Sequence, residues 1–456
     1  MSLFRTVPPM FPDQEKSVAT EIELGRVFDA SEPGTGKTRV RLEVFAKRRK
    51  AGGGCMLVLA PKSLLRTAWE SDARSYVNWL TVSVATAENR EKAFAKDADI
   101  YVTNHDAVKW LATKPASFFK KFDYLVIDES SAFKHHTSQR SKAVAKIRRY
   151  FKFRAVMNGL PTPNGVCDIW HQMYLVDDGK RLGESFYGFR SASCIPIQVG
   201  SKANMLKWED RPGIEDAVAE LVKDITIRNK LTGVPKNHMR PPTMFYMDKA
   251  HREAYETLKK EAVLQLKSGE ISAVNAAVLA NKLLQLTSGA VYDEAGNYHV
   301  LDKSRYELIA DLVEARKCSV VFMFWQHQRD LLVEEFNKRE LTHMIIDGDV
   351  SDRKRLENVQ MFEAGMFRAA LLHPKSAAHG LTLVRGKSTI WSGPTHDLEW
   401  WVQGNARIAR RGQVDETETI RILADNTYEE KVYEALEGKN VKAYDLLRSL
   451  VDETTA

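Results

Sequence analysis

Short apolar runs alternate with longer charged stretches of helical character along the first part of the chain. Such runs are typical of strands buried on both faces, and the stretches between them are typical of helices that cover a sheet. The pattern therefore predicts a parallel sheet with helices on its faces. The runs that we interpret as strands lie at residues 54–60, 100–103, 124–127 and 154–157.

The same pattern returns in the second half of the chain. Apolar runs that predict a second parallel sheet lie at residues 319–324, 343–346, 369–372 and 388–391. The fold class that we expect is therefore α/β, with two parallel-sheet lobes in tandem.

The region between the two sets of runs has a different character. Residues 178–213 are rich in Gly and Ser without clear periodicity, and the Pro and Gly residues of segment 231–242 indicate a connector, where we place the hinge. Residues 248–289 predict helices, because apolar side chains recur there at core-facing spacing. These side chains are Tyr255, Leu258, Ala262, Leu266, Val278, Leu283 and Leu286.

These patterns divide the chain into three expected parts. They are a first lobe at residues 1–172, a helical or irregular insertion and linker at 173–245, and a second lobe with an N-terminal helical insertion at 246–456.

Composition narrows the class of protein. A hydrophobic content of 44% is ample for sizeable cores, and no apolar run approaches the about 18 residues of a membrane span, so we expect a cytoplasmic protein. The net charge of +7 fits a polyanionic partner, but it is small enough to serve solubility alone. The four cysteines lie far apart in the sequence and indicate neither a disulfide framework nor a zinc cluster: Cys55, Cys167, Cys194 and Cys318.

The segment Ser31–Thr38 has the Gly-Lys-Thr ending of a phosphate-binding loop. Gly34 and Gly36, on either side of Thr35, let the backbone curl so that its N–H groups face phosphates. Lys37 supplies charge at the β and γ oxygens, and Thr38 offers a hydroxyl ligand to Mg²⁺. The alternative is a Gly-rich turn that caps a helix.

An acidic pair, Asp128 and Glu129, follows the apolar run at 124–127. Parallel sheets bind ligands at the carboxyl ends of their strands, so Asp128 is placed to hold Mg²⁺ while Glu129 orients and deprotonates the attacking water. An acidic residue that caps a helix N-terminus explains the pair equally well.

Gln14 lies about twenty residues before the phosphate loop. A glutamine amide both donates and accepts hydrogen bonds, which suits the N6 and N7 edge of adenine and favours ATP over GTP. A surface glutamine without a ligand is an equally good interpretation.

The segment Gln403–Gln413 is rich in arginine. If it is helical, Gln403, Arg407 and Arg410 fall at i, i+4 and i+7 and point from one face toward one partner. The alternative is a solvated, arginine-rich helix face.

Taken together, the motifs resemble the Swi/Snf-type branch of the superfamily-two helicases and translocases. The resemblance extends from about residue 8 to residue 437. The size of the chain is similar to that of compact, stand-alone bacterial or phage members of this branch. Besides the phosphate loop, the segments that carry it are 60–72 with Trp69, 128–138, 158–170, 347–355, 379–383 and 403–413.

The resemblance implies two RecA-like lobes with ATP and Mg²⁺ in a cleft between them. Lys37, Asp128 and Glu129 would act from the first lobe, while Gln403, Arg407 and the arginine finger Arg410 would act from the second. DNA would be gripped mainly at its phosphates. The residues expected at that contact are Ser63, Thr103, Asn104, Lys134, His379, Gly380 and Thr382.

The function that we expect is a DNA-stimulated ATPase that translocates on double-stranded DNA. A strand-separating helicase on DNA or RNA and a slow nucleotide-dependent switch or loader remain alternatives, although Glu129 and Arg410 argue against the switch. Two departures from the family pattern concern the coupling of hydrolysis to DNA. Asn158 and Leu160 replace two threonines, and Ser130-Ser131 replaces the more usual Ala-His.

Overall fold

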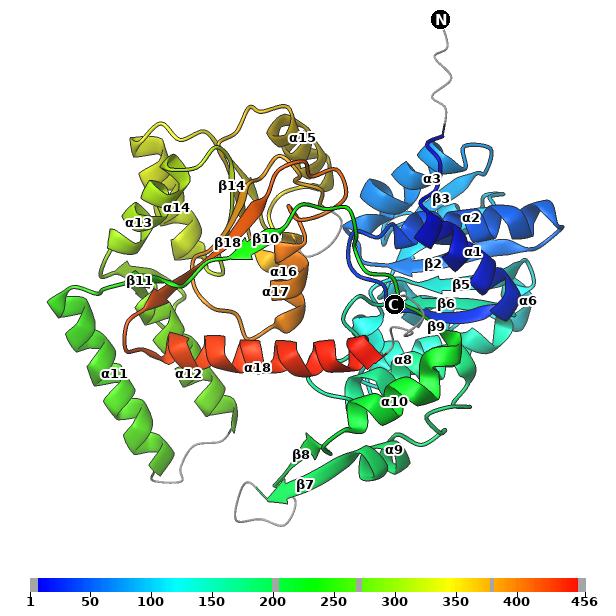
Figure 1. The fold of residues 1–456 in the computed structure, drawn as a ribbon, viewed down its shortest axis with the longest axis horizontal. Helices are drawn as coiled ribbons and strands as arrows, with labels where there is room; N and C mark the ends of the chain where they lie inside the picture. Colours follow the sequence, from blue (N-terminus) through cyan, green and yellow to red (C-terminus); the bar gives the residue numbers. More distant parts are fainter. Residues whose placement is uncertain (1–6, 199–204, 268–272, 378–380, 450–456) are drawn as a thin grey trace, which may run out of the picture. The chain divides into compact units, whose positions relative to one another are not determined.

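The computed structural model describes residues 7–198, 205–267, 273–377 and 381–449 (Figure 1). The chain forms two compact units. The first comprises residues 1–232 and 439–456, and the second comprises residues 233–438. The change from one unit to the other between Thr232 and Gly233 falls in the segment that we interpret as the connector.

The first unit contains a seven-stranded parallel sheet in the order β3-β4-β2-β5-β6-β1-β9. The four apolar runs predicted as strands form β2, β4, β5 and β6, so that prediction is confirmed. The bounds are β1 Arg26–Asp29, β2 Cys55–Ala60, β3 Val82–Ala85, β4 Ile100–Asn104, β5 Phe122–Ile127, β6 Phe153–Met157 and β9 Thr226–Ile227.

Helices and short helical turns surround this sheet (Figure 1). Val44 of α2, Val58 of β2 and Trp69 belong to one buried cluster, which forms the core on one face of the sheet. The α-helices are α1 Pro12–Leu24, α2 Lys37–Lys50, α3 Ser71–Tyr76, α4 Arg90–Ala95, α5 Ala107–Leu111, α6 Ala116–Phe119, α7 Gln139–Ile147 and α8 Cys167–Asp177. The shorter turns are Leu65–Glu70, Ser130–Phe133, Arg148–Tyr150 and Lys223–Ile225.

Asp178, the residue that follows α8, connects this helix to the sheet through ion pairs. Its backbone is left-handed, with φ of 64°, and its carboxylate contacts Arg154 of β6 at 2.6 Å, Arg26 of β1 at 2.8 Å and Arg148 at 2.8 Å. Burial raises the pKa of Asp178, but hydrogen bonds and charges from the three arginines outweigh it and hold the pKa at about 2.

Replacing Asp178 by asparagine is expected to lower the free energy of unfolding at neutral pH. Asparagine tolerates the left-handed backbone but cannot pair with the arginines as a charge. Because the folded-state pKa lies below the unfolded value of about 4, the carboxylate stabilises the fold above that pH, and this contribution fades as pH falls toward about 2. Urea denaturation of both proteins should show their difference shrinking over that range.

The exposed Asp349, whose side chain is 90% accessible, provides the matched control. Asp349→Asn makes the same chemical change where solvent screens the charge, so little effect on stability is expected. A difference between wild type and Asp178→Asn that stays constant with pH would show that the arginine contacts do not depend on ionisation.

Residues 178–213 contain a β-hairpin that the sequence pattern does not predict. Its strands pair Pro196 with Trp208, and Arg190 lies over the Trp208 ring at 4.0 Å. A proline inside a short exposed strand interrupts the alternation of apolar and polar residues by which a strand is recognised. The elements here are α9 Phe186–Ser193, β7 Cys194–Gln198 and β8 Leu206–Asp210, and α10 Ile214–Val222 follows them.

The hairpin brings two cysteines together that are distant in the sequence. The sulfur atoms of Cys167, in α8, and Cys194, at the start of β7, lie 3.3 Å apart, and both are free thiols. Burial raises the pKa of Cys167, so this thiol is a weak nucleophile.

The second unit contains another parallel sheet, in the order β10-β18-β17-β14-β16-β15, with β11 also paired to β18. The runs predicted as strands form β14, β15, β16 and β17, so the α/β class with two parallel-sheet lobes is confirmed. The bounds are β10 Asn237–Met239, β11 Thr243–Phe245, β14 Ser319–Phe322, β15 His343–Ile346, β16 Ala369–Leu372, β17 Ser388–Trp391 and β18 Thr417–Ala424.

The segment before this sheet is helical, as predicted. Tyr255, Leu283 and Leu286 are buried together, whereas Val278 is 51% exposed and does not face the core as expected. The helices that begin in the second unit are α11 Lys249–Lys267, α12 Ala273–Thr287, α13 Ser304–Glu314, α14 Gln326–Lys338, α15 Asp352–Glu363, α16 Pro374–Ala377, α17 Leu398–Asn405 and α18 Tyr428–Ser449. The part of α18 from Lys439 onward belongs to the first unit. A small hairpin, β12 Ala290–Tyr292 and β13 Tyr298–Val300, follows α12. Among the described helices, none has the length and apolarity to cross a membrane.

Candidate nucleotide and nucleic-acid site

The predicted phosphate loop joins the carboxyl end of β1 to the N-terminus of α2. Gly36 precedes the helix with φ of 85°, and a Cβ atom there would lie 2.2 Å from Nε2 of Gln14. Only glycine fits this conformation and this close approach. The loop therefore has the strand-to-helix setting in which backbone N–H groups at a helix N-terminus bind anions.

Lys37 folds back over the loop. Its Nζ donates to the backbone oxygens of Ser31 at 2.6 Å and Glu32 at 3.3 Å. The buried Asp29 fixes the start of the loop. Its carboxylate accepts a hydrogen bond from the Ser31 N–H at 2.9 Å and pairs with Arg41 at 3.1 Å. The ammonium group is thus held close to the backbone that would face phosphates.

Gln14 is buried rather than on the surface, so the interpretation as a surface glutamine is wrong. Its side chain is 3% exposed. Its Nε2 donates to the Thr35 carbonyl at 2.9 Å, and its Oε1 accepts from the Phe11 N–H at 3.2 Å. The amide therefore braces the phosphate loop from α1, and its recognition of adenine stays a prediction.

The chain that leads into the connector is also attached to the phosphate loop. Arg228 pairs with Glu32 at 3.1 Å, and the other carboxylate oxygen of Glu32 accepts the Leu231 N–H at 2.9 Å. The Asn229 N–H donates to the Ser31 hydroxyl at 3.0 Å. No local pattern in the sequence marks these residues, because Glu32 and Arg228 are 196 positions apart.

Asp128 directly follows β5, beside β2. Its carboxylate accepts the indole N–H of Trp69 at 3.0 Å, and its carbonyl oxygen is 2.7 Å from Nε2 of His105. Burial, and then the charge of Glu129, raise the pKa of Asp128 to about 7, although Trp69 and Lys37 act in the opposite direction. This carboxylate is therefore costly to ionise unless a cation lies beside it.

Glu129 adopts a left-handed backbone, with φ of 49°. It precedes a short 3-10 turn, but its side chain makes no capping hydrogen bond there. The alternative interpretation, in which the side chain of this acidic pair caps a helix, therefore does not explain the position of Glu129. A left-handed non-glycine residue costs conformational energy, and such residues persist where the surroundings fix them.

The candidate nucleic-acid residues of the first unit follow the neighbouring strands at the same edge of the sheet. Asn104 ends β4 and pairs in register with Ala60, the last residue of β2, and Ser63 lies three residues further on. Lys134 forms an ion pair with Asp168 at 3.3 Å. The Thr103 side chain differs, because it is fully buried and its hydroxyl donates to the Ala85 carbonyl at 2.9 Å.

In the second unit, the expectation of one helix through Gln403–Gln413 is wrong. Helix α17 ends at Asn405, and residues 406–412 form turns. One reason is tertiary, because the backbone oxygen of Arg407 accepts the Leu383 N–H at 3.1 Å. The other is local, because the side-chain amide of Gln413 donates to the Ile408 carbonyl at 3.1 Å. These bonds replace those that would continue the helix.

The two arginines nevertheless converge. Arg407 and Arg410 each donate from Nη1 to the Leu381 carbonyl, at 3.2 Å and 3.0 Å, and Arg407 also donates from Nε to the Gln403 carbonyl at 2.7 Å. Thr382, next to this shared acceptor, is exposed. The candidate residues His379 and Gly380 lie outside the described residues.

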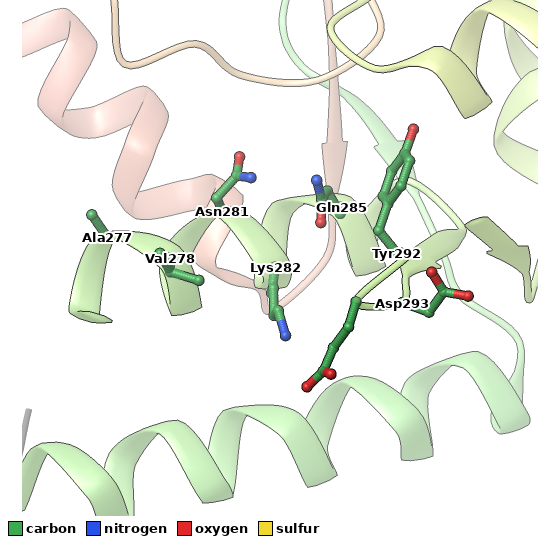
Figure 2. Close-up of a pocket in the computed structure, with 8 residues that line it drawn as sticks. Ala277, Val278, Asn281, Lys282, Gln285, Tyr292 and Asp293 are labelled. Carbon is green, nitrogen blue, oxygen red and sulfur yellow. The ribbon is translucent and has the colours of Figure 1, made fainter. Parts of the chain in front are cut away.

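The described residues of the second unit line surface hollows. One lies along α12 and β12, with Asn281, Lys282 and Tyr292 among the residues around it, and none of its lining residues belongs to the predicted site (Figure 2). Another lies where β14, β15 and β16 end. It contains Asp347 and Gly348, which carry part of the resemblance, and Asp347 pairs there with Arg329 at 3.1 Å.

Comparison with known proteins agrees with the motifs. The family model of the SNF2-related domain matches residues 27–289. Protein p41 of Acyrthosiphon pisum secondary endosymbiont phage 1 is 26% identical over 89% of this chain and 91% of its own length. The human SWI/SNF-related matrix-associated actin-dependent regulator of chromatin subfamily A member 1 is 25% identical over 90% of this chain and 40% of its own.

An uncharacterized ATP-dependent helicase of Mycoplasma genitalium is 22% identical over 87% of this chain and 37% of its own length. The Sulfolobus solfataricus SWI2/SNF2 ATPase core in complex with dsDNA aligns over 99% of both chains with a TM-score of 0.44 and 18% identity. The chain thus spans nearly all of the phage protein but less than half of the human and mycoplasma relatives.

The chain belongs to the SNF2-related family, the Swi/Snf-type branch of the superfamily-two helicase and translocase ATPases. The resemblance inferred from its motifs is thereby confirmed, and the protein is an ATP-hydrolysing enzyme.

Proposed function

We propose that this enzyme is a DNA-stimulated ATPase that translocates along double-stranded DNA. One observation carries the proposal: a single edge of the first sheet presents both sets of candidate residues. The phosphate loop follows β1 and the acidic pair follows β5, while Ser63 follows β2 and Asn104 ends the neighbouring strand β4. ATP and a DNA backbone bound at this edge would contact adjacent loops.

In the proposed mechanism, ATP binds with its phosphates at the N-terminus of α2. Lys37 leaves the backbone oxygens of the loop and pairs with the β and γ oxygens. Glu129 orients the attacking water and accepts its proton. Gln14 reaches the adenine edge from α1.

The residues at the loop fit a magnesium ion. Thr38 offers a hydroxyl and Asp128 a carboxylate, which are hard oxygen ligands of the kind that Mg²⁺ prefers. Burial and the charge of Glu129 raise the pKa of Asp128. A divalent cation beside this carboxylate would offset the cost of its buried charge. When bound, the ion neutralises charge on the phosphate oxygens.

Arg407 and Arg410 are the proposed arginines that neutralise the γ-phosphoryl as charge develops. Their shared acceptor, the Leu381 carbonyl, holds both guanidinium groups at one place. The planar guanidinium group suits the geometry of phosphate oxygens. Gln403 would sense the γ-phosphate or its water.

For the track, we favour a DNA duplex gripped at its phosphates by Ser63, Asn104, Lys134 and Thr382. Thr103 is fully buried between β2 and β3, so we do not include it in this contact. Contacts of this kind carry little sequence information, as movement along DNA requires. The human relative is named as a regulator of chromatin, which contains duplex DNA. The net charge of +7 agrees with a polyanionic partner.

Steady-state ATPase assays test this proposal, with no nucleic acid, single strands, blunt duplex, forked DNA and RNA measured in parallel. Blunt duplex should stimulate turnover most. Binding to duplex should weaken by about tenfold or more between 50 and 200 mM salt, if several phosphates are contacted. Stimulation by single strands or RNA but not by blunt duplex, together with unwinding of a tailed duplex, would favour the strand-separating helicase instead.

A further inference from the structure

The side chain of Gln172, in α8, is buried at the centre of a hydrogen-bond network. Its Oε1 accepts from the Ser130 hydroxyl at 2.6 Å and from Nδ2 of Asn158 at 2.7 Å. Its Nε2 donates to the backbone oxygens of Pro161 and Asp168, both at 2.8 Å. The amide thus uses both acceptor positions and both donor hydrogens.

The groups that Gln172 joins come from three separate segments. Ser130 directly follows Glu129, Asn158 and Pro161 belong to the loop after β6, and Asp168 lies in the first turn of α8. Gln172, Ser130 and Asn158 are at most 1% exposed. At this depth, each lost hydrogen bond leaves a buried polar group unsatisfied, so separating the three segments is costly.

The first of these segments carries Glu129, whose left-handed backbone places its carboxylate. Ser130 is the next residue, and its hydroxyl is fastened to Gln172. A shift of Gln172 would therefore move the anchored end of the Glu129 turn. Displacements of about 1 Å in a catalytic group change rates by up to about a hundredfold.

The network also reaches a candidate DNA contact. The Asp168 carboxylate pairs with Lys134 at 3.3 Å and accepts the Asn164 N–H at 3.1 Å. Lys134 is half-buried, so its ammonium group remains accessible to a phosphate. A bound phosphate would compete with the Asp168 carboxylate for that ammonium group. Asp168 is in turn bound through its backbone oxygen to Gln172. Lys134 and Glu129 are therefore joined through Asp168, Gln172 and Ser130.

We propose that Gln172 is a positioning residue that fixes the Glu129 turn and transmits to it the binding of DNA at Lys134. This inference rests on the proposed DNA-stimulated ATPase. The sequence departs from its family at Ser130-Ser131 and at Asn158, and in the structure Ser130 and Asn158 are the side chains that bind the Gln172 oxygen. A glutamine bridge thus connects the two segments in which those departures occur.

The test compares Gln172→Met, Lys134→Ala and the double variant by ATPase with and without duplex DNA. Methionine keeps the length of the side chain but removes all four hydrogen bonds. We expect each single change to lower the ratio of DNA-stimulated to DNA-free kcat by about tenfold, within the usual range of couplings between sites. The double variant should lose little more than either single variant, because both changes break one connection.

Ser130→Ala provides a milder change if Gln172→Met unfolds, which thermal denaturation would show. It removes one hydrogen bond to Gln172 and should lower the same ratio in the same direction while leaving the KM for ATP nearly unchanged. Ser319→Ala is the matched control, because the Ser319 hydroxyl is also buried and bonded to another side chain, Ser388 at 2.8 Å, away from the candidate site.

If the double variant lowers the ratio of DNA-stimulated to DNA-free kcat by the product of the two single effects, Gln172 and Lys134 act independently and the inference is overturned. A Ser130→Ala variant whose stimulated and DNA-free rates fall equally would also overturn it. If the wild-type enzyme shows no stimulation by DNA, the proposed function fails before these variants are compared, so the two failures are distinguishable.

Discussion

Replacing Lys37 by alanine should abolish ATP turnover while leaving a folded protein that still binds DNA. The change removes the positive charge closest to the phosphate loop, where Nζ now lies 2.6 Å from the Ser31 carbonyl. Losing one group that stabilises transition-state charge costs about a hundredfold or more in kcat. The measurement is steady-state ATPase with saturating duplex, combined with a DNA-binding assay.

Lys47→Ala is the control for this variant, because Lys47 is an exposed lysine of the same helix, α2. It should keep wild-type turnover. A Lys37→Ala enzyme that retained more than about a tenth of wild-type activity would show that this loop is not the catalytic site.

Replacing Arg410 by alanine should lower kcat by about a thousandfold with little change in the affinity for ATP. An inserted arginine acts mainly on charge that develops in the transition state, so its loss changes kcat more than binding. Arg410→Lys should restore little, because a point ammonium cannot both bind the Leu381 carbonyl and present a fork to phosphate. Single-turnover kinetics and nucleotide titration measure the two quantities separately.

The adjacent Arg411 supplies the control, since Arg411→Ala removes the same charge one residue away. Its kcat should stay within a few-fold of wild type. Equal losses of affinity and rate in Arg410→Ala would show that Arg410 stabilises bound ATP rather than the transition state.

The strands were predictable from sequence because they are buried on both faces. Strands such as β2 and β16 consist entirely of buried residues, so continuous apolar runs mark them. The helix predicted through Arg407 and Arg410 is wrong, because the Leu383 N–H, from a distant part of the chain, binds the Arg407 carbonyl in place of a helical donor. Local periodicity contains no information about such contacts.

In the candidate site, too, local sequence patterns predict the motifs but not the contacts between distant residues. The phosphate loop and the acidic pair follow from local patterns, and the structure places each after a strand of the first sheet. The contact of Glu32 with Arg228 and the bridge through Gln172 join residues far apart in the chain, so no short motif shows them. Gln14 looked equally suited to the surface, and only its burial against the loop distinguishes the two interpretations.

Displacement of a third strand from duplex DNA is the most direct test of movement along the track. A short oligonucleotide paired in the major groove is released when an enzyme moves along the duplex, without any need to separate the two strands. For a translocase we predict release with ATP, none with ADP, and none with the Lys37→Ala enzyme. Release that does not depend on ATP, or hydrolysis of ATP on the duplex with no release, would contradict this prediction.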